Sequence, residues 1–318
     1  EETPSLPETM PDGSPWPRIS IVTPSYNQGQ FIEETIRSAL LQGYPNLEYI
    51  IIDGGSTDNS VEIIKKYESW LAYWVSEKDR GQSHAINKGL GYCSGDIFNW
   101  INSDDLLAPN ALHVVALAWS KTPQVIIAGC VVNFNEAGNE ELISPNALTL
   151  ENFVNKRKAR ENRLAWHQPG IFLPRTGVNK AGGVQEGLRF TMDHFLMINL
   201  LKRYDVVYVP DVLARFRLHG NSKTLTYGSL HFKLERVKKL RTMKDLQQYV
   251  SPKELKQDQV SLLLAYAELE KGKARYGLAC RYYVNAFAES PFLAMAILLR
   301  RGVWGRIIQR DKHRAKNI

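Results

Sequence analysis

The sequence predicts an α/β protein built on a doubly wound, mostly parallel sheet, and three observations lead to this fold class. Stretches rich in β-branched residues are each followed by a polar turn with glycine or proline and then by a stretch of helical period. This strand–turn–helix unit recurs, as the βα units of a parallel sheet do. Polar and acidic residues follow the strands, at the sheet edge where such folds bind ligands.

The first half of the chain supplies the regular units. Each apolar strand is closed by a proline or a carboxylate, and the following helix is read from apolar residues three and four positions apart. The helix after the second strand also begins in a Ser/Thr/Asp cluster suited to capping. The expected units cover residues 19–40, 49–67, 71–89 and 97–105.

The second half is less regular, and from about Gly228 onward the pattern is helical. We expect a proline-started helix at 109–120, a strand at 125–134, a polar irregular stretch at 135–162, an extended stretch at 164–174, a helix at 190–201, and strands at 206–209 and 212–218.

Composition narrows the class of protein. The chain has 318 residues, of which 44% are hydrophobic and 23% charged, as in an ordinary globular protein with ample core. It has no run of 18 apolar residues, so no spanning helix is expected. Its three scattered cysteines form no zinc or disulfide pattern, which favours a reduced, cytoplasmic setting. Residues 1–17 contain five prolines and are predicted to be an extended tail rather than a signal peptide.

The net charge of +7 is unevenly distributed. Residues 1–230 hold 21 Lys/Arg against 25 Asp/Glu, whereas residues 231–318 hold 19 against 8. A basic C-terminal part suggests an anionic partner such as a membrane or a lipid-linked phosphate. No nucleic-acid-binding motif accompanies it, and a nucleic-acid partner is not expected.

The end of the chain has its own pattern. Residues 291–299 are apolar but too short to span a bilayer, and residues 300–316 carry seven Lys/Arg with one acid. This predicts a helix lying in the membrane interface, with Trp304 at headgroup level and peripheral contact with anionic lipid. The alternative is that its apolar face packs on the rest of the protein and its charges are solvated.

The most informative stretch is 101–105, where an apolar strand ends in the adjacent carboxylates Asp104 and Asp105. Carboxylate oxygens at a strand end could hold a divalent cation against a diphosphate. An Asp-Asp pair is also a common turn or helix cap, so the motif alone leaves both interpretations open.

With these segments in order, the chain resembles the family 2 glycosyltransferases, which have the GT-A fold and are inverting, nucleotide-sugar-dependent enzymes. The resemblance covers roughly residues 18–225, and similar proteins assemble bacterial surface polysaccharides and glycolipids. Six motifs carry it: Thr23–Asn27, Asp53–Asp58, Asp79–Gly81 with Asn87–Gly89, Asn102–Asp105, Met192–Asp193, and His219–Ser222.

The resemblance implies a donor site and a metal site. For the nucleotide-sugar donor it implies Thr23, Ser25, Asn27, Asp53, Arg80, Asn102 and Asp104. For Mn²⁺ or Mg²⁺ it implies Asp104, Asp105 and His219, and it does not say which aspartate touches the metal. Asn102 replaces the usual first acid of the motif, which keeps an oxygen acceptor but loses a charge, so a lower metal affinity is expected. Gly54 replaces a second acid near the nucleobase, so a uridine donor is favoured only weakly.

For the acceptor side the resemblance implies a general base, Asp193, although Met192 replaces the usual glutamate before it. It also implies Trp166, His167 and Gln168 as residues lining the site for a glycan or lipid-linked acceptor. An aromatic ring can stack on a sugar, whereas a packed Trp166 would be simply part of the core.

The sequence thus predicts a tail at 1–17, a GT-A domain at 18–227 and a basic helical region at 228–318. The nucleotide-sugar half would be about 18–110 and the acceptor half 111–227. A dehydrogenase would need G-x-G-x-x-G after the first strand, where Pro24–Gly29 stands instead. A non-catalytic protein of the same fold that binds a nucleotide-sugar or glycan is the alternative from another class.

Overall fold

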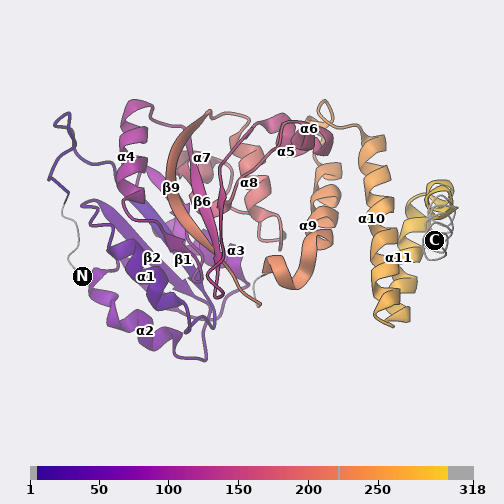
Figure 1. The fold of residues 1–318 in the computed structure, drawn as a ribbon, viewed down its shortest axis with the longest axis horizontal. Coiled ribbons are helices and arrows are strands. Elements are labelled where there is room, and N and C mark those ends of the chain that lie inside the picture. Colours follow the sequence, from indigo (N-terminus) through magenta and orange to yellow (C-terminus); the bar gives the residue numbers. More distant parts are fainter. Residues whose placement is uncertain (1–5, 221–222, 300–318) are drawn as a thin grey trace, which may run out of the picture. The chain divides into compact units, whose positions relative to one another are not determined.

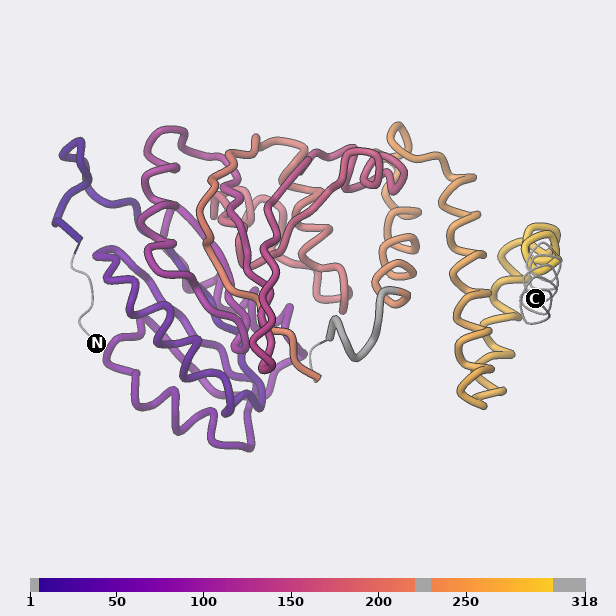
Figure 2. The backbone as a smooth tube through the Cα atoms, in the orientation of Figure 1, coloured from indigo at the N-terminus to yellow at the C-terminus, as the bar shows by residue number. Residues whose placement is uncertain are grey.

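The computed structural model describes residues 6–220 and 223–299. The chain divides into two compact units, Glu1–Leu225 and Thr226–Ile318, and each is described by itself. Figure 1 labels the elements, and Figure 2 follows the backbone through them.

The first unit contains one sheet with strand order β3-β2-β1-β4-β8-β6-β9-β5, and β7 pairs with β6. Its strands are β1 Ile19–Ser25, β2 Leu47–Asp53, β3 Tyr73–Ser76, β4 Ile97–Trp100, β5 Leu106–Leu107, β6 Ile126–Asn135, β7 Glu140–Ile143, β8 Ile171–Pro174 and β9 Val206–Leu218. Its helices up to β9 are α1 Ile32–Leu40, α2 Ser60–Lys66, α3 Gln82–Tyr92, α4 Ala111–Lys121, α5 Leu150–Val154, α6 Lys156–Glu161, α7 Arg175–Lys180 and α8 Met192–Leu200.

The strands β3, β2, β1 and β4 are all parallel, as the sequence predicts. Side chains alternate across this part of the sheet. Ile19, Ile21 and Ile51 belong to the core that also contains buried residues of α1, α2 and α4. Val22 and Ile52 point to the other face, where they meet α3. In this register Ser25 lies beside Asp53, so the polar ends of β1 and β2 are neighbours.

The rest of the sheet is mixed rather than parallel. The strand β8 runs antiparallel to both β4 and β6, and β6 runs parallel to β9. The two strands expected at 206–209 and 212–218 are one strand, β9, with irregular register against residues 128–131 of β6. The expectation of two strands is wrong because Pro210, which suggested a strand end, lies at a bulge within β9. The pairing with β6 is interrupted there and then resumes.

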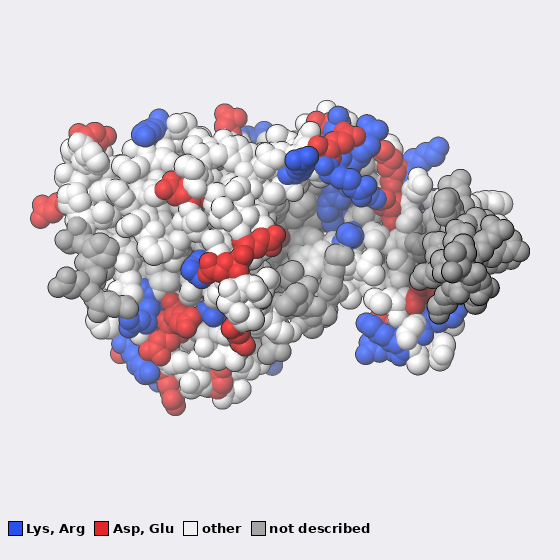
Figure 3. Space-filling model, in the orientation of Figure 1, with Lys and Arg blue, Asp and Glu red and all other residues white. Residues whose placement is uncertain are grey.

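Residues 135–162 were expected to be irregular, and this is wrong. They contain β7, α5 and α6. The basic run of 156–160 is the short helix α6, whose first turn is capped because the Asn155 side chain accepts hydrogen bonds from the backbone of Arg157 and Lys158. Figure 3 shows basic side chains gathered in this region.

The segment before β1 packs against the first unit from residue 6 onward. Met10 and Trp16 are buried and belong to its core. The Trp16 Nε1 donates to the carbonyl oxygen of Pro7 at 2.8 Å, and its ring packs edge-on against Tyr44. The segment turns back on itself at residues 10–14, where the Met10 N–H donates to the Ser14 carbonyl oxygen, and its side chains are anchored to the domain.

The second unit is helical. Its elements are α9 Lys223–Thr242, α10 Pro252–Gly272, α11 Tyr276–Glu289 and a last helix, Pro291–Leu299. A separate core joins α10 and α11, with Val260, Leu264 and Ala286 fully buried. Within the described ranges, no single helix is long and apolar enough to cross a membrane. Among the described helices, α11 and the last helix pass that test when they are taken together, but they are bent by 120°.

The last helix has two apolar faces. Ala294 is buried, and Leu293 and Ile297 pack on the same core. On the other side Phe292 is 90% exposed, Met295 49% and Leu299 61%. The basic residues 300–316 and Trp304, on which the membrane interpretation also depends, lie outside the described residues.

Two glycines of α3 test how closely this helix packs on β1 and β2. A Cβ on Gly89 would lie 2.5 Å from Cγ1 of Val22, whereas nothing lies within 4 Å of a Cβ on Gly91. We predict that Gly89→Ala lowers the free energy of unfolding by about 1–3 kcal/mol through overpacking. Gly91→Ala should leave it unchanged or raise it by about 0.4–1 kcal/mol. Urea denaturation measures both, and equal effects would contradict the close packing of α3.

Candidate active site

The carboxylate of Asp53 organises the loop after β2. The side chain is fully buried, and its Oδ2 accepts hydrogen bonds from the backbone of Gly55 and Ser56 and from the Ser76 hydroxyl, at 2.7–3.1 Å. Its Oδ1 accepts from the Ser56 hydroxyl at 2.5 Å. Both oxygens of this expected donor-site residue are therefore engaged in shaping the loop.

The loops after β1 and β2 are joined through Asn27. This residue has a positive φ of 52°, and its Oδ1 accepts a hydrogen bond from the backbone of Thr57 at 2.8 Å. Its own backbone N–H donates to the Ser56 hydroxyl at 2.8 Å. Asn and Asp tolerate this left-handed backbone better than most residues, which accounts for an asparagine at the turn.

Thr23 and Ser25, both on β1, differ in their surroundings. The Thr23 hydroxyl lies 3.0 Å from the Tyr49 hydroxyl, inside the protein. Ser25 ends the strand, and its buried hydroxyl has no hydrogen-bond partner among the described residues. A buried polar group without a partner is costly, so Ser25 is the more suitable of the two to meet a ligand.

The acidic motif after β4 is tied to β9. Asp105 is 1% exposed, and its two oxygens accept hydrogen bonds from the backbone N–H of Arg217 and from the Asn102 side chain, each at 3.0 Å. Burial, together with the nearby charge of Asp104, holds the pKa of Asp105 well above its usual range. The amide of Asn102 also accepts from the Gln82 side chain at 2.6 Å.

The link between β4 and β9 brings Asp104 to His219. These residues are 115 positions apart, and Nε2 of His219 lies 2.9 Å from Oδ2 of Asp104. The imidazole also packs against the Phe31 ring, with 4.7 Å between the ring centroids. Of the three expected metal ligands, these two meet, whereas Asp105 is directed to Arg217 and Asn102.

The pair suits a divalent cation by its donor chemistry. A carboxylate oxygen and an imidazole nitrogen are ligands that Mn²⁺ accepts, and two atoms 2.9 Å apart can bind one ion. Across residues 6–220 and 223–299, no group of three His, Cys, Asp or Glu side chains is arranged to hold a metal. The remaining positions would therefore be filled by donor oxygens or water.

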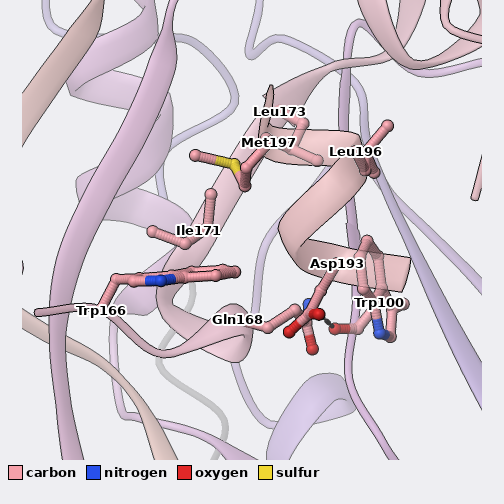
Figure 4. Close-up of a pocket in the computed structure, with 8 residues that line it drawn as sticks. All are labelled: Trp100, Trp166, Gln168, Ile171, Leu173, Asp193, Leu196 and Met197. Carbon is pink, nitrogen blue, oxygen red and sulfur yellow. Dashed lines mark hydrogen bonds between the residues drawn. The ribbon is translucent and has the colours of Figure 1, made fainter. Parts of the chain in front are cut away.

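A second cluster lies beside β4 and β8, where a pocket is lined by Trp100, Trp166, Gln168, Asp193 and apolar residues of β8 and α8. Figure 4 shows Asp193 and Gln168 directed toward the same space, with the Trp166 ring beside it. Asp193 lies in the first turn of α8, where the helix dipole stabilises its negative charge. The structure thus gathers three of the four residues expected on the acceptor side.

Gln168 and His167 have structural partners. The Gln168 Nε2 donates both of its hydrogens, to Oδ1 of Asn99 and to the carbonyl oxygen of Trp100, at 2.9 and 2.8 Å. His167 is not among the residues that line the pocket. Its ring packs on Phe216 at 5.0 Å, and burial lowers its pKa.

Arg80 lies in an exposed ion pair. Its Nη2 is 2.8 Å from the carboxylate of Glu186, and its side chain is 69% exposed. The hydrogen bond from Arg80 lowers the pKa of Glu186. No sequence pattern indicated Glu186. The motif that contains Asn87 was recognised, but not that the Asn87 side chain hydrogen-bonds to the backbone of Val184.

Comparison with known proteins points to one family. The profile of the family described as "Glycosyl transferase family 2" matches residues 20–181. The chain is 27% identical over 213 residues to an uncharacterised glycosyltransferase of Rickettsia typhi, a match that covers 66% of this chain and 67% of that one. It is 30% identical over 216 residues to glycosyltransferase GlyG of Streptococcus pneumoniae, which covers 64% and 72%. Its match to a Rickettsia conorii relative spans only 34% of that protein.

Two solved structures share the fold. TarS of S. aureus in complex with UDP-GlcNAc superposes with a TM-score of 0.59 at 17% identity, over 79% of this chain and 73% of that one. The mannosyltransferase PcManGT of Pyrobaculum calidifontis in complex with GDP-Man and Mn²⁺ gives 0.52 at 18% identity, over 96% and 84%. The expected GT-A fold with a helical C-terminal region is confirmed.

Replacing Asp104 and replacing Asp105 should lower the free energy of unfolding by different amounts. Asp105→Ala leaves two neutral buried donors, the Arg217 N–H and the Asn102 amide, without their acceptor, so we expect a loss of about 2–4 kcal/mol. Asp104→Ala removes a partly exposed partner of His219 and should cost under about 1 kcal/mol. Chemical denaturation of both variants checks this, and similar losses would show that Asp105 is not the residue that joins β4 to β9.

Proposed function

Because the chain belongs to glycosyl transferase family 2, we propose that it moves a sugar from a nucleotide diphosphate sugar to an acceptor hydroxyl, with inversion at the anomeric carbon. The observation that carries the proposal is the meeting of Asp104 with His219 at the ends of β4 and β9. A carboxylate and an imidazole at this edge of the sheet are suited to the metal–diphosphate chemistry of donor activation.

The donor would lie along the ends of β1, β2 and β4. The unpartnered hydroxyl of Ser25 and the loop that Asn27 and Asp53 shape support this placement. TarS is described with UDP-GlcNAc and PcManGT with GDP-Man and Mn²⁺, and both support a nucleotide-sugar donor here. They differ in the nucleotide, so the proposal is a class of donor.

We assign the metal to Asp104 and His219. When bound, Mn²⁺ or Mg²⁺ would offset the negative charge that builds up on the departing diphosphate. Asp105 would act indirectly, since its contacts with Asn102 and the Arg217 backbone fix the loop from which Asp104 projects.

Asp193 would accept the proton of the attacking hydroxyl as the acceptor oxygen bonds to the anomeric carbon. Trp166 lines the same pocket and offers an aromatic face on which an acceptor sugar could stack. Gln168 would contribute less directly, because its amide hydrogens hold the end of β4. A nucleotide-sugar-binding protein without turnover remains the alternative that the assays below distinguish.

Metal dependence is the first expected outcome. With UDP-, GDP- and dTDP-sugars offered to a panel of glycan acceptors, one donor should release nucleoside diphosphate. EDTA should abolish the release, and Mn²⁺ or Mg²⁺ should restore it. Asp104→Ala and His219→Ala should each lower the rate by roughly 10²-fold or more. Asp12→Ala, which removes an exposed acid before β1, is the matched control. Full activity in EDTA would exclude the metal-dependent mechanism.

The base is tested by Asp193→Asn, which keeps size and hydrogen bonding but cannot accept the proton. We expect kcat to fall by roughly 10²–10⁴-fold with donor binding nearly unchanged. Asp205→Asn changes an exposed acid directly before β9 and should be neutral. NMR of the product should show an inverted anomeric centre, and retention of configuration would rule out the proposed role.

We also propose that the last helix brings the enzyme to anionic membranes, where a lipid-linked acceptor of surface polysaccharide or glycolipid assembly would be found. Its outward residues Phe292, Met295 and Leu299 are apolar and exposed. In the sequence, seven Lys/Arg in residues 300–316 follow this helix directly. An exposed apolar helix face followed by cations suits the interface of an anionic bilayer.

Vesicle co-sedimentation tests the membrane proposal. The protein should bind vesicles containing phosphatidylglycerol, bind less as salt rises, and bind neutral vesicles weakly. Phe292→Asp with Met295→Asp should reduce binding by about tenfold or more, because two exposed anchors are replaced by charges. Leu142→Asp changes an exposed leucine of β7 and serves as control. Equal sedimentation of all variants would contradict this surface.

A further inference from the structure

Helix α3 contacts two parts of the first unit with two of its faces. Gly89 packs on Val22 and Ile52 of β1 and β2, the strands whose ends form the proposed donor site. Ser83 and Asn87, one helical turn apart, instead contact residues 182–192. We call residues 182–192 the base segment, because they lead directly to Asp193.

Asn87 holds the base segment at two points. Its Nδ2 donates to the carbonyl oxygen of Val184 at 2.8 Å, and its Oδ1 accepts from the Val184 N–H at 2.9 Å. A planar amide that satisfies both backbone groups of one residue fixes both its position and its orientation.

The residue before Val184 allows Asn87 to make this close contact. Gly183 has a φ of +73°, and a Cβ on it would lie 2.3 Å from Oδ1 of Asn87. Any other residue would therefore be strained in its backbone and would also displace the amide.

The remaining contacts with the base segment are either weaker or lie nearer the C-terminal end of that segment. The Ser83 hydroxyl donates to the sulfur of Met192, the residue before Asp193, and lies 3.4 Å from the carbonyl oxygen of Leu188. The pair of Arg80 with Glu186 is largely exposed, and such pairs contribute little. Asn87 therefore makes the best-defined connection between the base segment and α3.

We propose that Asn87 is a positioning residue for the catalytic base. It holds the base segment against the helix that packs on the donor strands, and so fixes Asp193 relative to the donor. The inference rests on the proposed function, since it takes Asp193 as the base. A displacement of about 1 Å in a reacting group can cost roughly 10²-fold in rate, so a contact nine residues before Asp193 can govern kcat.

A double-mutant cycle tests the proposal with the donor and acceptor that turn over. Asn87→Ala should lower kcat by roughly 10–100-fold and leave the donor KM within about twofold. In the Asp193→Asn background the same change should cost less than about threefold, because no base is left to misplace. Asn285→Ala, an exposed asparagine in α11, controls for loss of a helical asparagine.

Hydrogen exchange followed by mass spectrometry supplies a second readout that needs no substrate. Asn87→Ala should speed exchange in peptides covering 184–195 and leave those of β1 and β2 unchanged. If Asn87→Ala does not fold, Asn87→Asp replaces it, because it keeps the acceptor for the Val184 N–H but sets a carboxylate oxygen, in place of the donor, against the Val184 carbonyl oxygen.

Three results would overturn the proposal. One is an equal loss of kcat from the Asn87 change with and without Asp193. Another is faster exchange throughout the first unit, which would indicate a general structural role. The third is a wild-type rate in Asp193→Asn, which refutes the base assignment itself. The first two leave that assignment standing, so the failures are distinguishable.

Discussion

The buried carboxylate of Asp105 is the constraint on which the candidate site depends. A charge or polar group at this depth must be satisfied by the protein, and here the partners are the Asn102 side chain and the backbone of β9. In addition, the Thr35 hydroxyl of α1 donates to the backbone carbonyl oxygen of Asp105. Three elements distant in sequence are thereby joined beneath the loop that carries Asp104, and His219 arrives beside that loop two residues after Arg217.

Much of this arrangement was predictable from local patterns. Apolar runs that end in polar turns identified β1, β2, β3 and β4, and parallel pairing then required their carboxyl ends to share one edge. The Asp104–His219 contact was expected because the two motifs resembled parts of one family site. The irregular second half was less predictable, since the bulge in β9 and the short helices α5 and α6 arise from tertiary pairing and local caps.

The sequence did not predict which polar residues face a ligand and which shape a loop. Asp53 and Ser25 occupy adjacent strand ends, yet the first has its oxygens satisfied by neighbouring groups and the second does not. Asp104 and Asp105 are adjacent in sequence and differ in the same way. Which carboxylate turns inward is set by partners more than 100 residues away, such as Arg217, and no local pattern contains that information.

The shared use of α3 has a consequence for how acceptor preference could change among relatives. Residues 135–147, which carry the edge strand β7, contain no buried side chain, so substitutions there can accumulate one at a time. The stretch from Gly183 to Met192 is different, because its shape is matched to side chains of a helix that also packs on β1 and β2, the strands of the proposed donor site. A loop transplanted from another family member would bring the wrong backbone to Asn87. We therefore expect new acceptor specificities to be grafted more easily at 135–147, and exchange of 183–192 to require compensating changes in α3.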